Sequence, residues 1–371
     1  MIKVQGIIML EQGIHHHRII NPFAYMPKNK NMEFSILLHG SGEKKINCDI
    51  LVYNKYCTTP IERLKFFKKQ GIKIVVDVDD MWKVPPTHPN YQAFTYHKIG
   101  ELTEEHIKLA DLVICTTLRL QTAVRELNKN TVVIPNALPF GIDQYTVGDR
   151  ERAREISQND KMRFMYLAGA THKEDVKLLD GKFQRIGGEP FINNNAQFIL
   201  CGYNESEYKQ FNSKKDMEAN NDNYTIKKSP GEYGYMADVF RSTKSFVIYP
   251  SVAIEHYLNY YDSAEVALAP LKDTPWNNMK SELKIVEAAC KKIPIICSYV
   301  PPYSDAVEFE QEGVIMVHHQ DDWIKHIRYC IKNPNFVEDQ GQRLFEWVSE
   351  SHDLIKWNIV RQQVFESLVK E

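Results

Sequence analysis

The sequence contains no apolar run of the length that a membrane span needs, which is about 20 residues. Its N-terminal stretch MIKVQGIIMLEQG has a short apolar run with no cleavage-site pattern after it, so we expect no secretory signal. Neither sign of charge dominates, because 46 Lys and Arg stand against 48 Asp and Glu. The sequence therefore gives no strong nucleic-acid signal and argues against a basic membrane-binding protein, although peripheral membrane contact stays open.

Cysteine is scarce, with seven residues that form no CxxC pair. Most of them lie in apolar runs such as FILCG and PIICS, which is typical of buried free thiols in a reducing compartment. Together with the missing membrane span, this predicts a cytoplasmic protein.

The length and the strand pattern predict two α/β domains. A chain of 371 residues is too long for one ordinary core, and 43% hydrophobic and 25% charged residues are typical of a globular protein. Short β-branched runs alternate with helical stretches, which is the pattern of parallel βαβ units. We therefore expect two Rossmann-like doubly wound domains.

The expected strands fall into two series, separated by a polar stretch at 139–161. We place the first domain at 1–150, the second at 151–350 and a C-terminal helix at 351–371, packed back on the first domain. First-domain strands are expected at 4–10, 34–40, 49–55, 72–80, 112–117 and 131–137, with helices at 60–70 and 102–110. Second-domain strands are expected at 163–169, 196–202, 265–271, 294–298 and 313–319.

One stretch, PWNNMKSELKIVEAACKKIPIICS at 275–298, has the pattern of an anion site. Doubly wound domains bind ligands where strands lead into helix N-termini, and we expect a helix from about 280 to 292. Lys280 and Ser281 would then lie in the first turn within reach of a phosphate, and Glu287 could accept hydrogen bonds from a ribose diol. The same pattern allows a capping Ser281, a solvated Lys280 and a surface ion pair at Glu287.

The stretch from Pro270 onwards resembles the donor-site segment of the GT-B glycosyltransferases, specifically the group 1 or GT4-like set in its divergent Lys-Ser form. The matching residues are Pro270, Leu271, Asn277, Lys280, Ser281, Lys284, Glu287 and Pro294. The segments 72–91, 110–138 and 165–179 resemble other parts of the same family in the same order, with Gly169, His172 and Asp175 at matching places. The resemblance covers nearly the whole chain.

This resemblance implies the GT-B architecture, in which the two domains face a central cleft. It implies transfer of a sugar from a nucleotide-diphosphate sugar, UDP- or GDP-linked, to a hydroxyl acceptor such as a polysaccharide or lipid-linked glycan. It also implies retention of anomeric configuration without a metal or other cofactor. The donor-binding residues would be Gly169, His172, Asn277, Lys280, Ser281 and Glu287. The sequence departs from the better-known members at Met279, where they carry a second Glu, and in the segment AGATHKED, which lacks their Arg and Lys.

Three acidic residues, Asp77, Asp79 and Asp80, end a predicted strand at the mouth of the first domain. Their mutual repulsion could give one of them a raised pKa suited to proton abstraction, and they could also bind the acceptor. Alternatively, Asp80 caps the next segment and Asp77 binds backbone amides. A Mg²⁺ or Mn²⁺ site is a further alternative, which the resemblance disfavours.

Histidines supply the remaining candidates. His16, His17 and Arg18, with the adjacent His15, follow the first strand and are predicted acceptor contacts; a solvated loop or a metal site are the alternatives. His88 and His172 lie in loops expected to flank the cleft from opposite domains, where either could contact a hydroxyl of the donor sugar, and an exposed loop histidine is the alternative; His88 is included among the catalytic candidates. Tyrosines at 257–261 fit the core face of a helix, with no chemistry assigned.

Four functions are compatible with these patterns. Sugar transfer to a glycan or lipid-linked acceptor ranks first. The others are a nucleotide-sugar epimerase of the same fold, a non-catalytic nucleotide-sugar-binding module, and a phage-type enzyme that glycosylates DNA.

Overall fold

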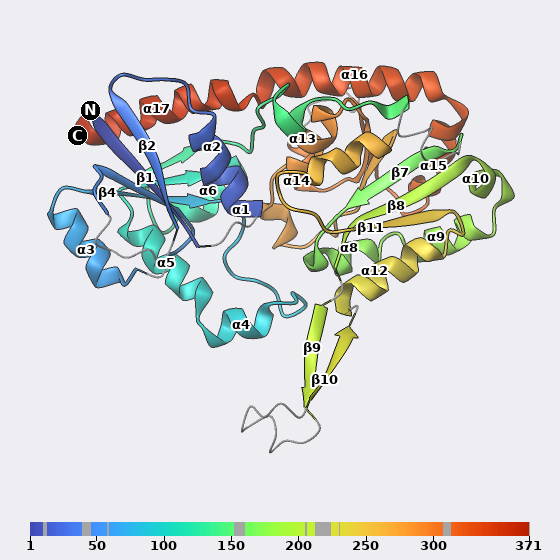
Figure 1. The fold of residues 1–371 in the computed structure, drawn as a ribbon, viewed down its shortest axis with the longest axis horizontal. Helices are drawn as coiled ribbons and strands as arrows, with labels where there is room; N and C mark the ends of the chain where they lie inside the picture. The colour runs from blue at the N-terminus through green and yellow to red at the C-terminus, as the bar shows by residue number, and fades with distance from the viewer. Residues whose placement is uncertain are drawn as a thin grey trace.

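The computed structural model describes residues 1–9, 13–38, 46–57, 59–151, 160–204, 206–211, 224–229, 231–306 and 313–370. It contains two α/β domains side by side, and a pair of long C-terminal helices runs along both (Figure 1). Residue 10 of the first predicted strand, residues 39–40 of the second and residues 152–159 of the predicted domain boundary lie outside the described residues.

The first domain is built on a six-stranded parallel sheet in the order β2-β1-β3-β4-β5-β6. Its strands are β1 (Ile2–Ile8), β2 (Met32–Leu38), β3 (Ile50–Asn54), β4 (Lys73–Val78), β5 (Leu112–Cys115) and β6 (Thr131–Val133). Its longer helices are α3 (Ile61–Lys69), α4 (Tyr91–Tyr96), α5 (Ile99–Leu109) and α6 (Leu118–Arg125). Strand β3 and strand β5 are buried along their whole length, which explains their continuous apolar runs.

The segment after β1 is helical, so the solvated-loop alternative for the three histidines is wrong. It forms α1 (Gly13–His15), a π-helical turn η1 (His16–Ile20) and α2 (Asn21–Ala24). His15, His16, His17 and Arg18 are all buried. The segment lies directly on β1, because a Cβ at Gly6 would come within 2.6 Å of the Ile19 side chain.

The second domain is built on a six-stranded parallel sheet in the order β11-β8-β7-β12-β13-β14. Its strands are β7 (Met162–Leu167), β8 (Ala196–Tyr203), β11 (Phe246–Pro250), β12 (Val266–Ala269), β13 (Ile295–Ser298) and β14 (Val314–Val317). The predicted doubly wound α/β class is therefore confirmed. The edge strand β11 was not predicted, although its residues FVIYP form a short apolar run.

The helices of the second domain include α8 (Lys173–Val176), α9 (Asp180–Gly187), α10 (Pro190–Asn195), α12 (Gly231–Arg241), α13 (Leu283–Cys290), α14 (Pro301–Ser304) and α15 (Asp322–Lys332). An antiparallel hairpin, β9 (Ser206–Phe211) and β10 (Tyr224–Ser229), projects away from this domain (Figure 1).

Two consecutive helices, α16 (Pro334–Ser351) and α17 (Leu354–Lys370), connect the domains. Helix α17 lies against the first domain, where the Asn358 side-chain amide donates to the Pro22 carbonyl at 2.8 Å and the Gln362 amide donates to the Pro27 carbonyl at 2.7 Å. Phe365 is buried in the same core as Val4 and Ile8. Among the described residues, no helix combines the length and the apolar character needed to cross a membrane.

Candidate active site

A cleft of about 490 Å³ lies between the carboxyl ends of the two sheets. The first domain contributes residues from three separate segments, including Gly13, His17 and Asp79. The second domain contributes Gly169, which follows the end of β7, and two residues of α13, Leu283 and Glu287. The cleft therefore lies where doubly wound sheets bind ligands, and it collects several of the residues singled out from the sequence.

Glu287 lies in the second turn of α13 and is 2% exposed. Its Oε1 accepts a hydrogen bond from the Tyr257 hydroxyl at 3.0 Å, and its Oε2 accepts from the Tyr261 hydroxyl at 2.8 Å and from Lys284 Nζ at 2.7 Å. Although burial alone raises the pKa of Glu287, the Lys284 charge and these hydrogen bonds bring it below its usual value. Glu287 is therefore a buried carboxylate on the cleft wall; its ion pair with Lys284, which the alternative placed on the surface, is present but is joined by two tyrosine hydroxyls on the buried carboxylate.

Tyr257 joins Glu287 to the first domain, because its hydroxyl also lies 2.9 Å from Nε2 of His17. A carboxylate can only accept, so the single hydroxyl hydrogen of Tyr257 goes to Glu287 and the hydroxyl oxygen accepts from His17 Nε2–H. Burial lowers the pKa of His17 to about 4, so the ring is neutral. Its Nδ1 is consequently an acceptor, and it is buried without a hydrogen-bond partner among the described residues.

The tyrosines of the segment 257–261 therefore have a role that sequence analysis did not assign to them. The segment forms a short 3-10 helix, Tyr257–Ser263, before β12. The spacing of its tyrosines correctly predicted a face directed into the core, since Tyr257 and Tyr261 are both buried. Spacing alone could not show that their hydroxyls bind a glutamate more than 25 residues further along the chain.

Helix α13 begins at Leu283, so the predicted start at 280 is wrong. Residues Asn277–Met279 form a separate 3-10 turn, after which Lys280 is extended. The turn is held by the Asn277 side-chain amide, which donates to Asp175 Oδ1 and to the Lys272 carbonyl, each at 2.9 Å. These bonds stop the helix from extending backwards, and Lys280 and Ser281 precede its first turn.

Lys280 contacts Trp276 beside the cleft, and Ser281 contacts the first domain across it. Lys280 Nζ lies 4.3 Å from the centre of the Trp276 ring, a cation–π contact. Burial lowers the pKa of Lys280, and the negative charge of Asp80 opposes that effect. Ser281 Oγ accepts a hydrogen bond of 2.6 Å from Asn136 of the first domain. Lys280 is therefore not a solvated surface lysine.

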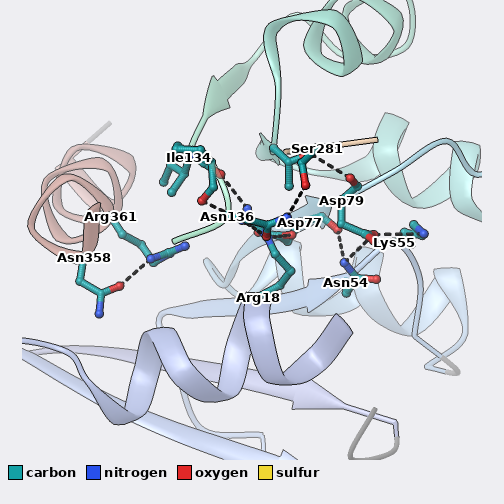
Figure 2. A network of polar contacts seen from close by, with 12 residues as sticks. Arg18, Asn54, Lys55, Asp77, Asp79, Ile134, Asn136, Ser281, Asn358 and Arg361 are labelled. Atoms are coloured by element: carbon teal, nitrogen blue, oxygen red, sulfur yellow. Dashed lines mark hydrogen bonds and ion pairs between the residues drawn. The ribbon is translucent and has the colours of Figure 1, made fainter. Parts of the chain in front are cut away.

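Asp77 and Arg18 form a buried pair, drawn in Figure 2. The Arg18 guanidinium donates to both Asp77 oxygens at 2.8 and 2.9 Å, to the carbonyls of Ile134 and Pro135, and to the Asn136 side chain. All five of its donors are engaged within the chain. Arg361 extends from α17 towards this cluster (Figure 2), and burial lowers its pKa to about 9.

Asp79 and Asp80 share one lysine. Lys55 Nζ lies 3.0 Å from Asp79 Oδ1 and also donates a hydrogen bond to Asp80. Lys55 directly follows β3, and its backbone has a φ of 51°. Burial and the neighbouring Asp79 charge raise the pKa of Asp80. The pKa of Asp79 is lowered, because Lys55 outweighs burial there. Of the two, Asp80 is the carboxyl whose proton affinity is increased, as the like-charge argument from the sequence anticipated.

The remaining histidines point to different partners. His16 Nε2 lies 3.2 Å from the Tyr145 hydroxyl. His172 Nδ1 lies 2.8 Å from Asp175 Oδ2, and burial lowers the pKa of His172. His88 packs against Trp276 with ring centroids 5.1 Å apart. Within the described residues no group of three or more His, Cys, Asp or Glu side chains is arranged to hold a metal ion.

A second pocket of about 370 Å³ lies beside the cleft, between the loop of Met81–His88 and the loop of Lys272–Met279. His88 and Asn277 line this pocket rather than the cleft. The predicted site residues are thus divided between two adjacent cavities. Lys55, Trp276, Tyr257 and Tyr261 belong to the same region but were not singled out from the sequence.

Comparison with solved structures identifies the architecture. The chain superposes over 99% of its length on 99% of sucrose-phosphate synthase from Thermosynechococcus elongatus, with a TM-score of 0.67 and 13% identity. A glycosyltransferase from Rickettsia africae matches with a TM-score of 0.64 and 12% sequence identity, covering 100% of this chain and 99% of that one. HepE from Anabaena in complex with UDP-glucose matches with a TM-score of 0.63 and 11% sequence identity, covering 100% of both chains. The expected GT-B fold is therefore confirmed. No family model and no curated protein sequence matches the chain.

Proposed function

We propose that the protein is a glycosyltransferase that moves a sugar from a nucleotide-diphosphate sugar to a hydroxyl group of a glycan or lipid-linked acceptor. The observation that carries this proposal is the ionised Glu287, held on the cleft wall by two tyrosines and a lysine. Three of the roughly four lone-pair positions of this carboxylate are taken by Tyr257, Tyr261 and Lys284, and the remaining one, on Oε1, is suited to accept a ribose hydroxyl. Solved structures of the same fold contain UDP-glucose or UDP, which supports a UDP-linked donor before a GDP-linked one.

The diphosphate would bind at the entrance of α13. Lys280 and Lys284 supply positive charge there, and Ser281 supplies a hydroxyl close to the free amides of the helix start. On the opposite wall Gly169 has no side chain and so leaves room for the donor to approach the backbone. His172 and Asn277 both bind Asp175 and hold the neighbouring loops in place. In this proposal these cations replace a metal ion as the stabiliser of the leaving diphosphate.

Sugar transfer requires one bond to form and one to break. The acceptor oxygen bonds to the anomeric carbon, the bond from that carbon to the diphosphate oxygen breaks with its electron pair leaving on the diphosphate, and the hydroxyl proton must be taken up. We assign this proton to the Asp79–Asp80 pair, in which Asp80 has the raised pKa. His88 lies nearby and would orient the acceptor. We propose retention of anomeric configuration from the resemblance of the donor segment.

Arg18 and Asp77 have a positioning role in this proposal. Since all five donors of Arg18 are used within the chain, the pair holds the carboxyl end of β4 and the Asn136 segment together. His16 is bound to Tyr145, so His17, which lines the cleft, is the histidine of this segment placed to touch a ligand. We propose that the reaction takes place in the cytoplasm.

Nucleotide binding tests the donor site directly. We expect one of UDP, GDP, ADP, CMP and dTDP to raise the melting temperature, with UDP the first candidate. Lys280→Ala should weaken the binding of that nucleotide by about 1.5–3 kcal/mol through loss of a charge-assisted contact. The exposed Lys325→Ala, on α15 outside the cleft, serves as the control. Absence of a shift with every nucleotide would reject the proposal.

Turnover separates the proposed transferase from its alternatives. With a labelled nucleotide sugar, a transferase releases nucleoside diphosphate in proportion to acceptor. An epimerase would change the sugar without any acceptor, and a binding module would produce no change at all. Steeply salt-dependent binding to duplex DNA would indicate the DNA-modifying alternative.

A further inference from the structure

The second pocket has the chemistry of a sugar-binding site. Its wall is the Trp276 ring, with His88 packed edge-on against it at 5.1 Å between ring centroids. Flat aromatic rings pack against the apolar face of a pyranose, while its hydroxyls need donors and acceptors at the rim. Thr87, Thr171 and Thr274 supply such groups around the opening.

Two buried polar atoms at this pocket lack partners among the described residues, namely Trp276 Nε1 and Asn277 Oδ1. Asn277 is 5% exposed, and its amide nitrogen faces the Asp175 carboxylate, which leaves Oδ1 as the free acceptor. A buried polar atom without a partner is costly, so such atoms mark places where a ligand can complete the hydrogen bonding. One of these atoms is a donor and the other an acceptor, and a hydroxyl group can serve either.

The two lysines that line the pocket, Lys83 and Lys272, are paired with acidic side chains. Lys83 Nζ lies 2.6 Å from Glu104, and Lys272 Nζ lies 3.7 Å from Glu174. Burial lowers the pKa of His88, so that ring adds no positive charge near neutral pH. An anionic ligand would have to compete with these acidic partners, whereas an uncharged hydroxylated ring would not.

Two chain segments pass directly from the cleft to this pocket. In the first, Asp79 lines the cleft and Met81 lines the pocket, with Asp80 between them. In the second, Met279 lines the pocket and Leu283 lines the cleft, with Lys280 between them. Asp80 and Lys280 also interact electrostatically. The two cavities therefore meet at the carboxyl and the ammonium group to which we assigned proton uptake and diphosphate binding.

We infer that the pocket between the loops Met81–His88 and Lys272–Met279 binds the acceptor as an uncharged pyranose packed against Trp276, with its reacting hydroxyl directed towards Asp80. This inference rests on the proposed function for the identity of the reaction. It specifies the acceptor as a neutral sugar unit rather than a sugar phosphate.

Saturation-transfer NMR tests this inference without turnover. The probes are methyl α- and β-glycosides of glucose, galactose and mannose, with glucose 6-phosphate as the anionic comparison, added to protein saturated with the nucleotide that binds. We expect at least one methyl glycoside to bind, and to bind more tightly than the phosphate. Thr87→Trp fills the mouth of the pocket from an exposed position and should weaken that glycoside by about tenfold or more, while nucleotide affinity stays within about twofold.

Thr95→Trp on α4 is the matched control, because it adds the same side chain at an exposed position outside the pocket. It should leave glycoside binding unchanged. Trp276→Phe keeps an aromatic face but removes the indole N–H, and should weaken the glycoside less than Thr87→Trp does.

Three results would overturn the inference: no methyl glycoside binds to the nucleotide-loaded protein, binding persists in Thr87→Trp, or glucose 6-phosphate binds more tightly than the methyl glycosides. In each case nucleotide binding could still be intact, so the donor proposal would survive. Conversely, glycoside binding that Thr87→Trp abolishes, in a protein that binds no nucleotide, would retain the sugar pocket and reject the donor site.

Discussion

The Asn136 side-chain amide donates a hydrogen bond of 2.6 Å to Ser281 Oγ and so joins the two domains at the cleft. The orientation of that amide is set from the other side, because Asn136 Oδ1 accepts from Arg18, which is itself bound to Asp77. A chain of contacts thus runs from the carboxyl end of β4 to the start of α13 (Figure 2).

We predict that Asn136→Ala and Ser281→Ala are energetically coupled. Each removes the same cross-domain hydrogen bond, so the double variant should lose less stability than the sum of the two, by about 0.5–1.5 kcal/mol. Chemical denaturation of the wild type, both single variants and the double variant measures this coupling. Strict additivity would show that the bond contributes nothing to domain association.

Arg18→Lys is predicted to be strongly destabilising. Lysine cannot replace five fixed donors, so Asp77 and two backbone carbonyls would lose buried partners, at a cost of about 3–5 kcal/mol. The exposed Arg119, paired with Asp305, offers the matched control, and Arg119→Lys should change the free energy of unfolding by less than about 0.5 kcal/mol. Equal effects of the two substitutions would contradict the assigned role of Arg18.

Glu287→Gln is predicted to reduce the preference for ribonucleotides. The substitution keeps the shape of the side chain but weakens its acceptance of ribose hydroxyls, so the ratio of affinities for UDP and 2′-deoxy-UDP should fall towards one. Calorimetric titration with the two nucleotides measures this ratio, and Glu346→Gln on the exposed side of α16 is the control. An unchanged ratio would separate Glu287 from the ribose.

Tyr261→Phe should lower both stability and nucleotide affinity. Removing one donor from the buried Glu287 carboxylate costs about 1–3 kcal/mol, because the lone pair it leaves is not reached by water. The control Tyr235→Phe removes a partly buried hydrogen bond from the Tyr235 hydroxyl to Asp180, outside the cleft, and should lower stability less. Thermal unfolding with and without nucleotide compares them, and equal losses would contradict the special role of the Glu287 network.

Stability should fall as the pH falls from about 6.5 to about 4. Burial lowers the pKa of His17 and of His106 to about 4, whereas unfolded histidine titrates near 6.5. The unfolded state therefore binds more protons in this window, and the free energy of unfolding falls by up to about 1.4 kcal/mol per pH unit for each histidine. His106→Gln should flatten this dependence, and His97→Gln, at an exposed position, should leave it unchanged. Identical slopes in both variants would contradict the assignment.

The sheets could be predicted because their signal is local. Buried parallel strands such as β3 and β5 are continuous apolar runs, and a run identifies itself without knowledge of its neighbours. The edge strand β11 was not predicted although FVIYP is such a run, because it directly follows the polar stretch 203–243 in which no elements could be placed. Glu287, Lys280 and the Asp79–Asp80 pair were found from their spacing within single segments and from the resemblance those segments carry.

What joins these residues was decided only by the tertiary structure. Lys55 reaches Asp79 and Asp80 from the neighbouring strand, and Tyr257 links His17 to Glu287 across 240 and 30 residues of sequence. The start of α13 was likewise set by Asp175, which binds Asn277 from helix α8, about a hundred residues earlier in the chain. Periodicity encodes which face of an element is buried, but hydrogen-bond partners depend on which segments the sheet order brings together. The sequence by itself therefore determined the two sheets and the residues at their carboxyl ends, and the packing of the domains decided how those residues form one site.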